Sequence, residues 1–92
     1  MKVKAIQCNS CGDVVYSRAN EDYRECGCGC VGASGGQQYP KFHAASRTPH
    51  KKIKIDVDTD LFNLYNDWKE MLDAYGLIPK STRRAPTQYI VQ

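Results

Sequence analysis

Hydrophobic and polar residues alternate along two segments of the chain. Residues 2–6 read Lys-Val-Lys-Ala-Ile, and residues 52–57 read Lys-Ile-Lys-Ile-Asp-Val. Successive side chains of a β-strand point to opposite faces, so this alternation gathers the apolar residues on one face. The pattern predicts two half-buried strands, with Ile53, Ile55 and Val57 on the buried face of the second.

After the second strand, the apolar residues recur with a longer period. From about Thr59 to Tyr75, apolar residues recur every three or four positions, which is the spacing of one face of an α-helix. This stripe consists of Leu61, Leu64, Tyr65, Trp68, Met71, Leu72 and Tyr75. Asp58 or Thr59 can cap the beginning of the helix, and Gly76 is placed to end it. We expect an amphipathic helix that packs its stripe on the sheet.

Three other segments carry weaker patterns. Residues 32–36 are rich in glycine and predict a turn. Residues 37–43 predict an edge strand, because Pro40 has no N–H to donate to a neighbouring strand. Residues 88–92 are β-prone, so they either pair with a sheet edge or dock onto a partner by strand addition.

The composition shows why such a fold needs a staple. Leu, Ile, Val and Phe account for only 17 of the 92 residues, too few for a large hydrophobic core. The length excludes a two-domain enzyme or a nucleotide-binding α/β fold. Five cysteines suggest a metal or disulfides instead. We find neither a secretion signal nor a membrane span in the sequence, so we expect a cytoplasmic protein, in which clustered cysteines bind metal.

Four of the five cysteines form two closely spaced pairs. Cys8 and Cys11 are followed at once by a glycine, and so are Cys26 and Cys28. The 14 residues between the pairs read as strand, polar turn and strand, a hairpin that would bring the pairs together. Four thiolates around one ion form the tetrahedral site of a structural zinc. The expected cofactor is therefore one structural Zn²⁺, with iron bound by the same sulfurs as the alternative.

The fifth cysteine, Cys30, leaves the choice of the second pair open. Cys26 with Cys28, Cys26 with Cys30, and Cys28 with Cys30 all have usable spacing. The first pair is favoured because Gly29 then repeats the position of Gly12 after the first pair. A glycine there lets the backbone turn tightly, so that amide groups can face the sulfurs. Cys30 remains the alternative ligand.

The segment Gln7–Tyr39 resembles a family of short, uncharacterised zinc-ribbon proteins of phages and bacteria. The family pattern is C-x-x-C-G-D, a turn ending in Asp-Phe, C-x-C-G and G-G-x-x-Y, and every spacing is kept here. The matching residues are Cys8, Cys11, Gly12, Asp13, Asp22, Cys26, Cys28, Gly29, Gly35, Gly36 and Tyr39, and Tyr23 stands in place of the phenylalanine. The resemblance implies a zinc-ribbon fold and supports Cys26 with Cys28, but it implies no established activity. Ser34 and Gln38 stand where the family usually has acidic residues.

Charge and chemistry favour a protein that is not an enzyme. One divalent ion bound by four thiolates lowers the net charge from +3 to about +1, less than a generic nucleic-acid binder carries. Such an ion has no open position for a substrate, and His43 and His50 have no obvious carboxylate partner in the sequence. The candidate residues for binding a nucleic acid or another partner are Arg47, Lys51, Lys52, Lys54, Arg83 and Arg84.

The expected fold class is small α+β, a zinc-ribbon antiparallel sheet stapled by the four-cysteine site with one helix packed on it. Residues 1–43 form the zinc-ribbon β region and residues 44–50 a linker. Residues 51–78 add a strand and the helix to the same domain, and residues 79–92 form a basic tail.

The expected function is that of a phage-type accessory or regulatory adaptor that binds a host protein in the host cytoplasm. The alternative is a nucleic-acid-binding zinc ribbon that uses the basic segments 47–54 and 80–84. Neither a membrane nor a small-molecule substrate is expected as a partner.

Overall fold

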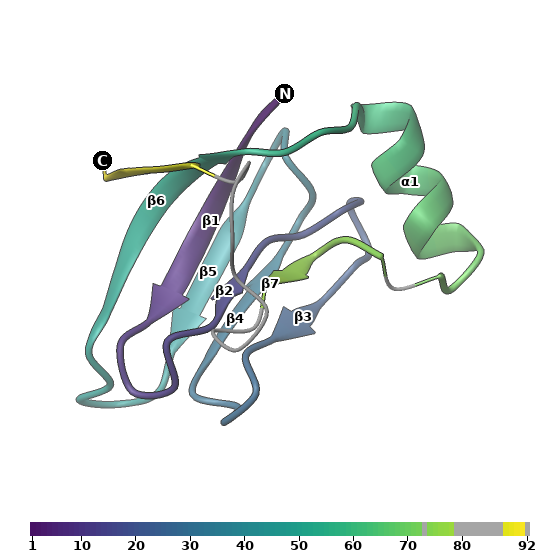
Figure 1. The fold of residues 1–92 in the computed structure, drawn as a ribbon. Coiled ribbons are helices and arrows are strands. Elements are labelled where there is room, and N and C mark those ends of the chain that lie inside the picture. Colours follow the sequence, from purple (N-terminus) through teal and green to yellow (C-terminus); the bar gives the residue numbers. More distant parts are fainter. Residues whose placement is uncertain (73, 79–87, 92) are drawn as a thin grey trace.

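The computed structural model describes residues 1–72, 74–78 and 88–91, which form two antiparallel sheets and one helix (Figure 1). The first sheet has the strand order β7-β2-β1-β6-β8. Its strands are β1 (Lys2–Cys8), β2 (Val14–Val15), β6 (His50–Asp56), β7 (Leu77–Ile78) and β8 (Gln88–Val91). The second sheet has the order β3-β4-β5, with β3 (Arg24–Glu25), β4 (Val31–Ser34) and β5 (Lys41–Ala44). The helix α1 is Leu61–Lys69. No helix in the described part of the chain is long and apolar enough to cross a membrane.

The two strands predicted by alternation, β1 and β6, are the centre of the first sheet. They pair along their whole length, with Val3 opposite Ile55 and Ala5 opposite Ile53. All four of these side chains are buried. The first core is formed by Val3, Ala5, Val14, Tyr16, Ile53, Ile55, Val57 and Leu64. The buried face predicted for the second strand is therefore confirmed.

A second core lies between the two sheets. From the first sheet it receives Ile6 and Val15, and from β4 it receives Val31 and Ala33. The sulfur-bearing side chains of Cys8 and Cys26 belong to the same cluster. The second sheet thus packs on the face of the first sheet that is opposite to the first core, and the cysteines meet where the two sheets join.

The helix is shorter and more exposed than its apolar stripe predicts. It ends at Lys69 instead of Tyr75, and Leu64 is the one stripe residue that is fully buried. The exposed fractions of Leu61, Tyr65, Met71 and Leu72 are 57, 46, 83 and 66%. Figure 1 shows α1 standing beside the sheets, not lying across a sheet face. Leu64 belongs to the first core and Tyr75 packs against it, so the stripe packs on the sheet only at these two residues, and the prediction is wrong for the exposed remainder.

The N-terminal cap of α1 is Asp60. Its carboxylate accepts the N–H of Asn63 at 2.8 Å, which satisfies one of the free amide groups of the first turn. The sequence pattern had favoured Asp58 or Thr59, one or two residues earlier.

The C-terminal end of α1 differs from the prediction because a hydrogen bond to a side chain of the helix turns the chain back. Met71 has φ +56°, and the chain turns back there so that the amide of Ala74 reaches Asp67 on the helix. Gly76 does not end the helix. Its carbonyl accepts the N–H of Tyr16 at 2.9 Å, which leads the chain into β7.

The hairpin predicted between the two cysteine pairs is also wrong. Its two strands exist as β2 and β3, but they belong to different sheets, β2 pairing with β1 and β7, and β3 with β4. The connection between them, residues 16–23, passes from one sheet to the other. The cysteine pairs meet because the sheets pack against each other, not because a hairpin returns.

Strand β4 was missed because its segment is rich in glycine. Residues 31–34 form the central strand of the second sheet, and the turn predicted for 32–36 is limited to its end. The ring of Tyr23 lies close over Gly32, where a Cβ would be 2.7 Å from the hydroxyl oxygen. The edge strand predicted for 37–43 is β5, which begins only after Pro40.

Residues 88–91 pair with β6 as the edge strand β8, with Ile55 opposite Tyr89. This is the first of the two roles expected for the β-prone end of the chain. The remainder of the expected basic tail, 79–87 and residue 92, lies outside the described residues.

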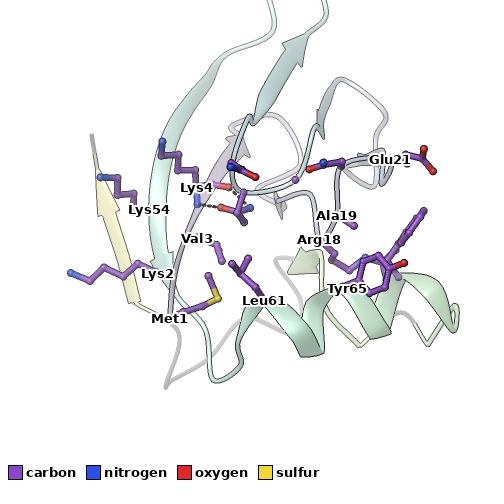
Figure 2. A pocket seen from close by; sticks show the side chains of 15 residues that line it. Met1, Lys2, Val3, Lys4, Arg18, Ala19, Glu21, Lys54, Leu61 and Tyr65 are labelled. Atoms are coloured by element: carbon purple, nitrogen blue, oxygen red, sulfur yellow. Dashed lines mark hydrogen bonds between the residues drawn. The ribbon is translucent and has the colours of Figure 1, made fainter.

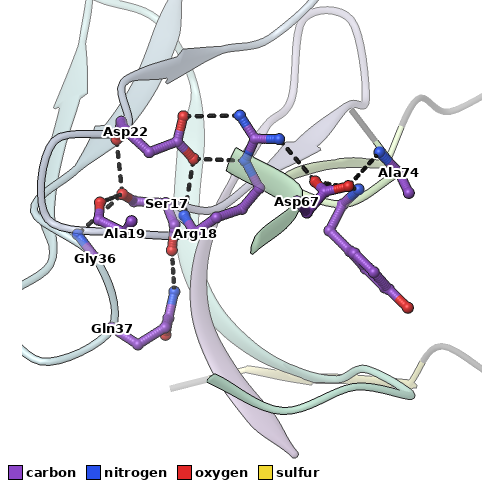
Figure 3. Close-up of polar contacts among 9 residues, drawn as sticks. Ser17, Arg18, Ala19, Asp22, Gly36, Gln37, Asp67 and Ala74 are labelled. Carbon is purple, nitrogen blue, oxygen red and sulfur yellow. Dashed lines mark hydrogen bonds and ion pairs between the residues drawn. The ribbon is translucent and has the colours of Figure 1, made fainter. Parts of the chain in front are cut away.

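A buried arginine connects α1 to the sheets (Figure 3). The Nε and Nη2 atoms of Arg18 donate to the carboxylate of Asp22 at 2.8 and 3.0 Å, and Nη1 donates to Asp67 on α1 at 2.7 Å. Asp67 also accepts the backbone N–H groups of Ala74 and Tyr75, at 2.9 and 3.0 Å. Only 2% of Asp67 is exposed. Burial alone would raise its pKa, but these hydrogen bonds outweigh burial and hold the pKa below its ordinary value.

We expect Asp67→Ala to lower the free energy of unfolding by about 3–5 kcal/mol, because it removes one of the carboxylates that bind the buried guanidinium. Asp60→Ala in the same helix removes only the exposed cap and is the matched control, with an expected cost of about 1 kcal/mol. Urea unfolding of the metal-loaded proteins measures both. Equal costs for the two variants would show that the buried network does not hold α1.

Candidate metal centre

The first cysteine pair lies on a tight turn at the end of β1. The N–H of Cys8 donates to the carbonyl of Asp13 at 2.9 Å, and the N–H of Gly12 donates back to the carbonyl of Cys8 at 2.7 Å. Gly12 has φ +82°, a conformation that side chains disfavour. The turn therefore closes with Cys8 and Cys11 on the same side.

The second pair lies on a turn of similar construction after β3. The N–H of Cys26 donates to the carbonyl of Val31 at 3.0 Å, and the N–H of Gly29 donates to the carbonyl of Cys26 at 2.9 Å. Gly29 has φ +75°. The tight turn expected at the glycine after each cysteine pair is confirmed, because both glycines adopt a left-handed conformation.

The two turns bring four sulfur atoms together. The Sγ atoms of Cys8, Cys11, Cys26 and Cys28 all lie within 4.8 Å of one another. Two of the separations are 3.4 Å, between Cys26 and Cys28, and 3.6 Å, between Cys8 and Cys28. Four sulfurs at about 2.3 Å from a tetrahedral ion are about 3.8 Å apart. The donor set and its size therefore fit one metal ion, and the four cysteines could hold it.

Cys30 is not a member of this group. Its Sγ atom is 4.0 Å from the carbonyl oxygen of Cys28, and its side chain packs against the second core. The pair favoured from the spacing, Cys26 with Cys28, is the pair that the structure places beside Cys8 and Cys11.

Two contacts outside the sulfur group orient the second turn. The carboxylate of Asp13 accepts the N–H of Gly27 at 2.7 Å, so the residue after the first turn holds the second turn directly. The N–H of Val31 donates to the Sγ of Cys26 at 3.5 Å. Burial raises the pKa of Cys26, but this amide and the neighbouring thiols outweigh burial and lower the pKa to about 7. The thiolate, which is the form that binds metal, is thus well populated near neutral pH.

Asp13 is a positioning residue that the sequence reasoning did not single out. It appeared only as part of the C-x-x-C-G-D pattern, with no role attached to it. What the sequence does not show is the burial of Asp13, since only 8% of the residue is exposed. A buried carboxylate beside a cysteine turn is expected to be bonded to backbone N–H groups.

The other candidate residues do not form a single site. Lys51 lies on one face of β6 and Lys52 and Lys54 on the other, since neighbouring residues of a strand alternate. Arg47 is exposed in the turn before β6. Arg83 and Arg84 lie outside the described residues.

The two histidines are also separate from each other. The ring of His43 lies against that of Tyr23, with centroids 5.5 Å apart. The Nδ1 atom of His50 is 2.8 Å from the carbonyl oxygen of Thr48.

Comparison with family models matches residues 1–44 to a domain of unknown function (DUF7695). The matched segment begins before β1 and ends with β5, so it contains both cysteine turns and the whole second sheet. The expectation of an uncharacterised family over this segment is thereby confirmed. Comparisons with curated proteins and with solved structures yield no match.

We expect Cys30→Ser to retain about one equivalent of metal per chain, because its sulfur lies outside the group. Cys28→Ser removes one of the four donors and is expected to purify with strongly reduced metal. Elemental analysis of the two purified variants makes the comparison. Metal lost from Cys30→Ser and kept by Cys28→Ser would reverse the ligand assignment.

We expect Asp13→Ala to weaken metal binding by about tenfold, because the second cysteine turn loses the carboxylate that positions Gly27. Asp58→Ala removes an exposed carboxylate far from the cysteines in sequence and is the control. Competition with a chromophoric chelator measures both affinities, and circular dichroism at saturating metal verifies that each variant is folded. An unchanged affinity would show that Asp13 has no part in the site.

Proposed function

We propose that the sulfur cluster binds one structural Zn²⁺ and that the protein is a zinc ribbon. An all-cysteine donor set is typical of structural zinc sites, and the sulfur separations are close to those around a tetrahedral ion. Two tight turns on different sheets supply the ligands, so the ion would join the sheets at the second core. Iron is the competing occupant, since the same ligands bind it.

We further propose that the protein is a non-enzymatic accessory or regulatory adaptor, of the kind that phages encode, which acts by binding a host protein. The observation that supports this is the closed donor set. Four thiolates complete a tetrahedral coordination sphere, so no position remains at which a bound water or substrate could be activated. The role of the metal is then to hold a binding surface in place.

A nucleic-acid-binding zinc ribbon is the second candidate. The ammonium group of Lys52 lies over the ring of Phe42, 6.0 Å from its centroid, on the same face as Lys54. Cationic and aromatic groups that lie together can bind unpaired nucleotides. The opposite orientation of Lys51 divides the basic segment 47–54 between two faces and weakens this candidate.

We expect metal analysis to give about one zinc per chain, and a strong chelator to unfold the region around the cysteines, since metal binding is coupled to folding at such sites. Circular dichroism follows unfolding, and restored signal on adding Zn²⁺ shows reversibility. A protein that keeps its full structure without metal contradicts the structural role, and a ferric thiolate absorption spectrum would identify iron.

The adaptor role is tested with the same material. Metal-loaded protein, immobilised on beads, is expected to retain a stoichiometric host protein that the chelator-treated protein does not retain. Salt-sensitive retention of nucleic acid with no protein partner would favour the second candidate instead.

A further inference from the structure

A groove of about 960 Å³ lies between the first sheet and α1 (Figure 2). One rim carries the cationic side chains of β1 and β6, and the other carries exposed and half-buried apolar side chains of the helix. These two groups are Lys2, Lys4 and Lys54, and Leu61, Tyr65 and Trp68. In Figure 2 the lysines lie on the sheet side, across the groove from Tyr65 and Glu21.

The cationic rim has an energetic cost in the free protein. Lys4 lies directly opposite Lys54 in the pairing of β1 with β6. The N–H of Val57 bonds to the carbonyl of Met1, so the odd-numbered residues of β1 form the hydrogen-bonded pairs with β6. Lys4 and Lys54 are therefore a non-hydrogen-bonded pair, in which opposite side chains are closest and like charges repel. Within the described part of the chain, neither ammonium group forms an ion pair with a carboxylate.

Among the residues that the structure describes, no strand pairs with the start of β1 on the side of the groove. Pairing of β1 with β2 ends at Ile6, and the next position, Lys4, is paired by a side chain instead. The amide of Gln37 accepts the N–H of Lys4 at 2.6 Å and donates to its carbonyl at 3.2 Å. Beyond Gln37, the alternation directs the N–H and C=O groups of Lys2 to the same side, into the groove.

The helical rim supplies an apolar contact surface. The rings of Tyr65 and Trp68 lie 5.7 Å apart with an angle of 55° between their planes. Tyr65 and Leu61 are about half exposed, at 46 and 57%. An exposed aromatic residue that lies against a partly buried one, beside a polar rim, is typical of surfaces that bind another protein.

We infer that this groove binds an extended, acidic segment of a protein partner, with its carboxylates at Lys4 and Lys54 and its apolar side chains on Tyr65 and Leu61. The proposal rests on the adaptor function and names the chemistry of the partner. Side chains of an extended segment alternate in direction, so acidic and apolar residues in alternation can reach both rims at once. Its backbone can bond to Lys2 at the open edge of β1. Glu21 on the far side keeps the acidic residues on the lysine rim.

The test uses zinc-loaded full-length protein and a mixture of synthetic peptides in which Asp or Glu alternates with Val, Leu, Phe or Tyr. Peptides retained by the protein are titrated singly by fluorescence anisotropy. Lys4→Glu and Lys54→Glu are each expected to weaken binding by about tenfold or more, because they place like charges against the ligand. The matched control is Lys51→Glu, which makes the same change in net charge on the opposite face of β6 and is expected to change the affinity by less than about twofold.

A second pair of variants tests the helical rim. Tyr65→Ala is expected to weaken binding by about fivefold or more, while Phe62→Ala, which removes an exposed aromatic side chain outside the groove, leaves the affinity unchanged. Amide spectra of the complex are expected to show Lys2 protected from solvent exchange on binding, a sign of backbone pairing that charge attraction alone does not give.

Three results would overturn the inference. They are the absence of any retained acidic peptide, an equal loss of affinity in Lys51→Glu, and displacement of the peptides by oligouridine that binds more tightly and with the same dependence on Lys4. If Lys4→Glu still retains the captured host protein, the groove is not the binding surface, whereas the adaptor function stands. If no host protein is captured by the folded wild type, the adaptor function itself fails.

Discussion

The guanidinium of Arg18 joins α1 to the connection between β2 and β3. Arg18 lies in this connection, binds Asp22 in the turn that leads to β3, and binds Asp67 on α1. A buried guanidinium must have its charge and its N–H groups satisfied, because the cost of leaving them unpaired is several kcal/mol. The positions of the turn and of the helix are therefore tied to one side chain. Such a network adds little net stability over apolar packing, but it specifies one arrangement.

This constraint explains why α1 can be both fixed and exposed. A helix in a small domain is usually held by the burial of its apolar face. Here Leu64 alone among the stripe residues is fully buried, and the carboxylate of Asp67 on the same helix supplies the second attachment. Because a polar contact also holds the helix, not every apolar side chain of the stripe has to be buried in the core. Leu61, Tyr65 and Trp68 form one wall of the groove.

The sequence predicted those features of the fold that depend on the alternation of apolar residues or on the short spacing of the cysteines. The strands β1 and β6 follow from alternation, since a shift of one residue would turn Ile53 and Ile55 to the wrong face. The four clustered cysteines follow from two short spacings, each with a glycine that permits its turn. The failures have a common cause, because each depends on contacts between distant residues. Asp67 accepts amides beyond the helix end and shortens α1, and β4 is a strand although its glycine content predicts a turn.

Neither the role of Asp13 nor the pairing of the two rim lysines can be predicted from the sequence, because both depend on contacts between distant residues. Asp13 is one acidic residue among ten, and only its burial and its contact with Gly27 separate it from the others. In the sequence, Lys54 belongs to a basic segment with Lys51 and Lys52, whereas in the sheet its nearest charged neighbour across the ladder is Lys4, fifty residues earlier. A repulsive pair of this kind lowers stability unless a ligand compensates for it. Its position beside the exposed side chains of Leu61 and Tyr65 makes an anionic, partly apolar ligand the simplest physical reason for both features, because one extended segment would neutralise the lysines and cover the apolar side chains together.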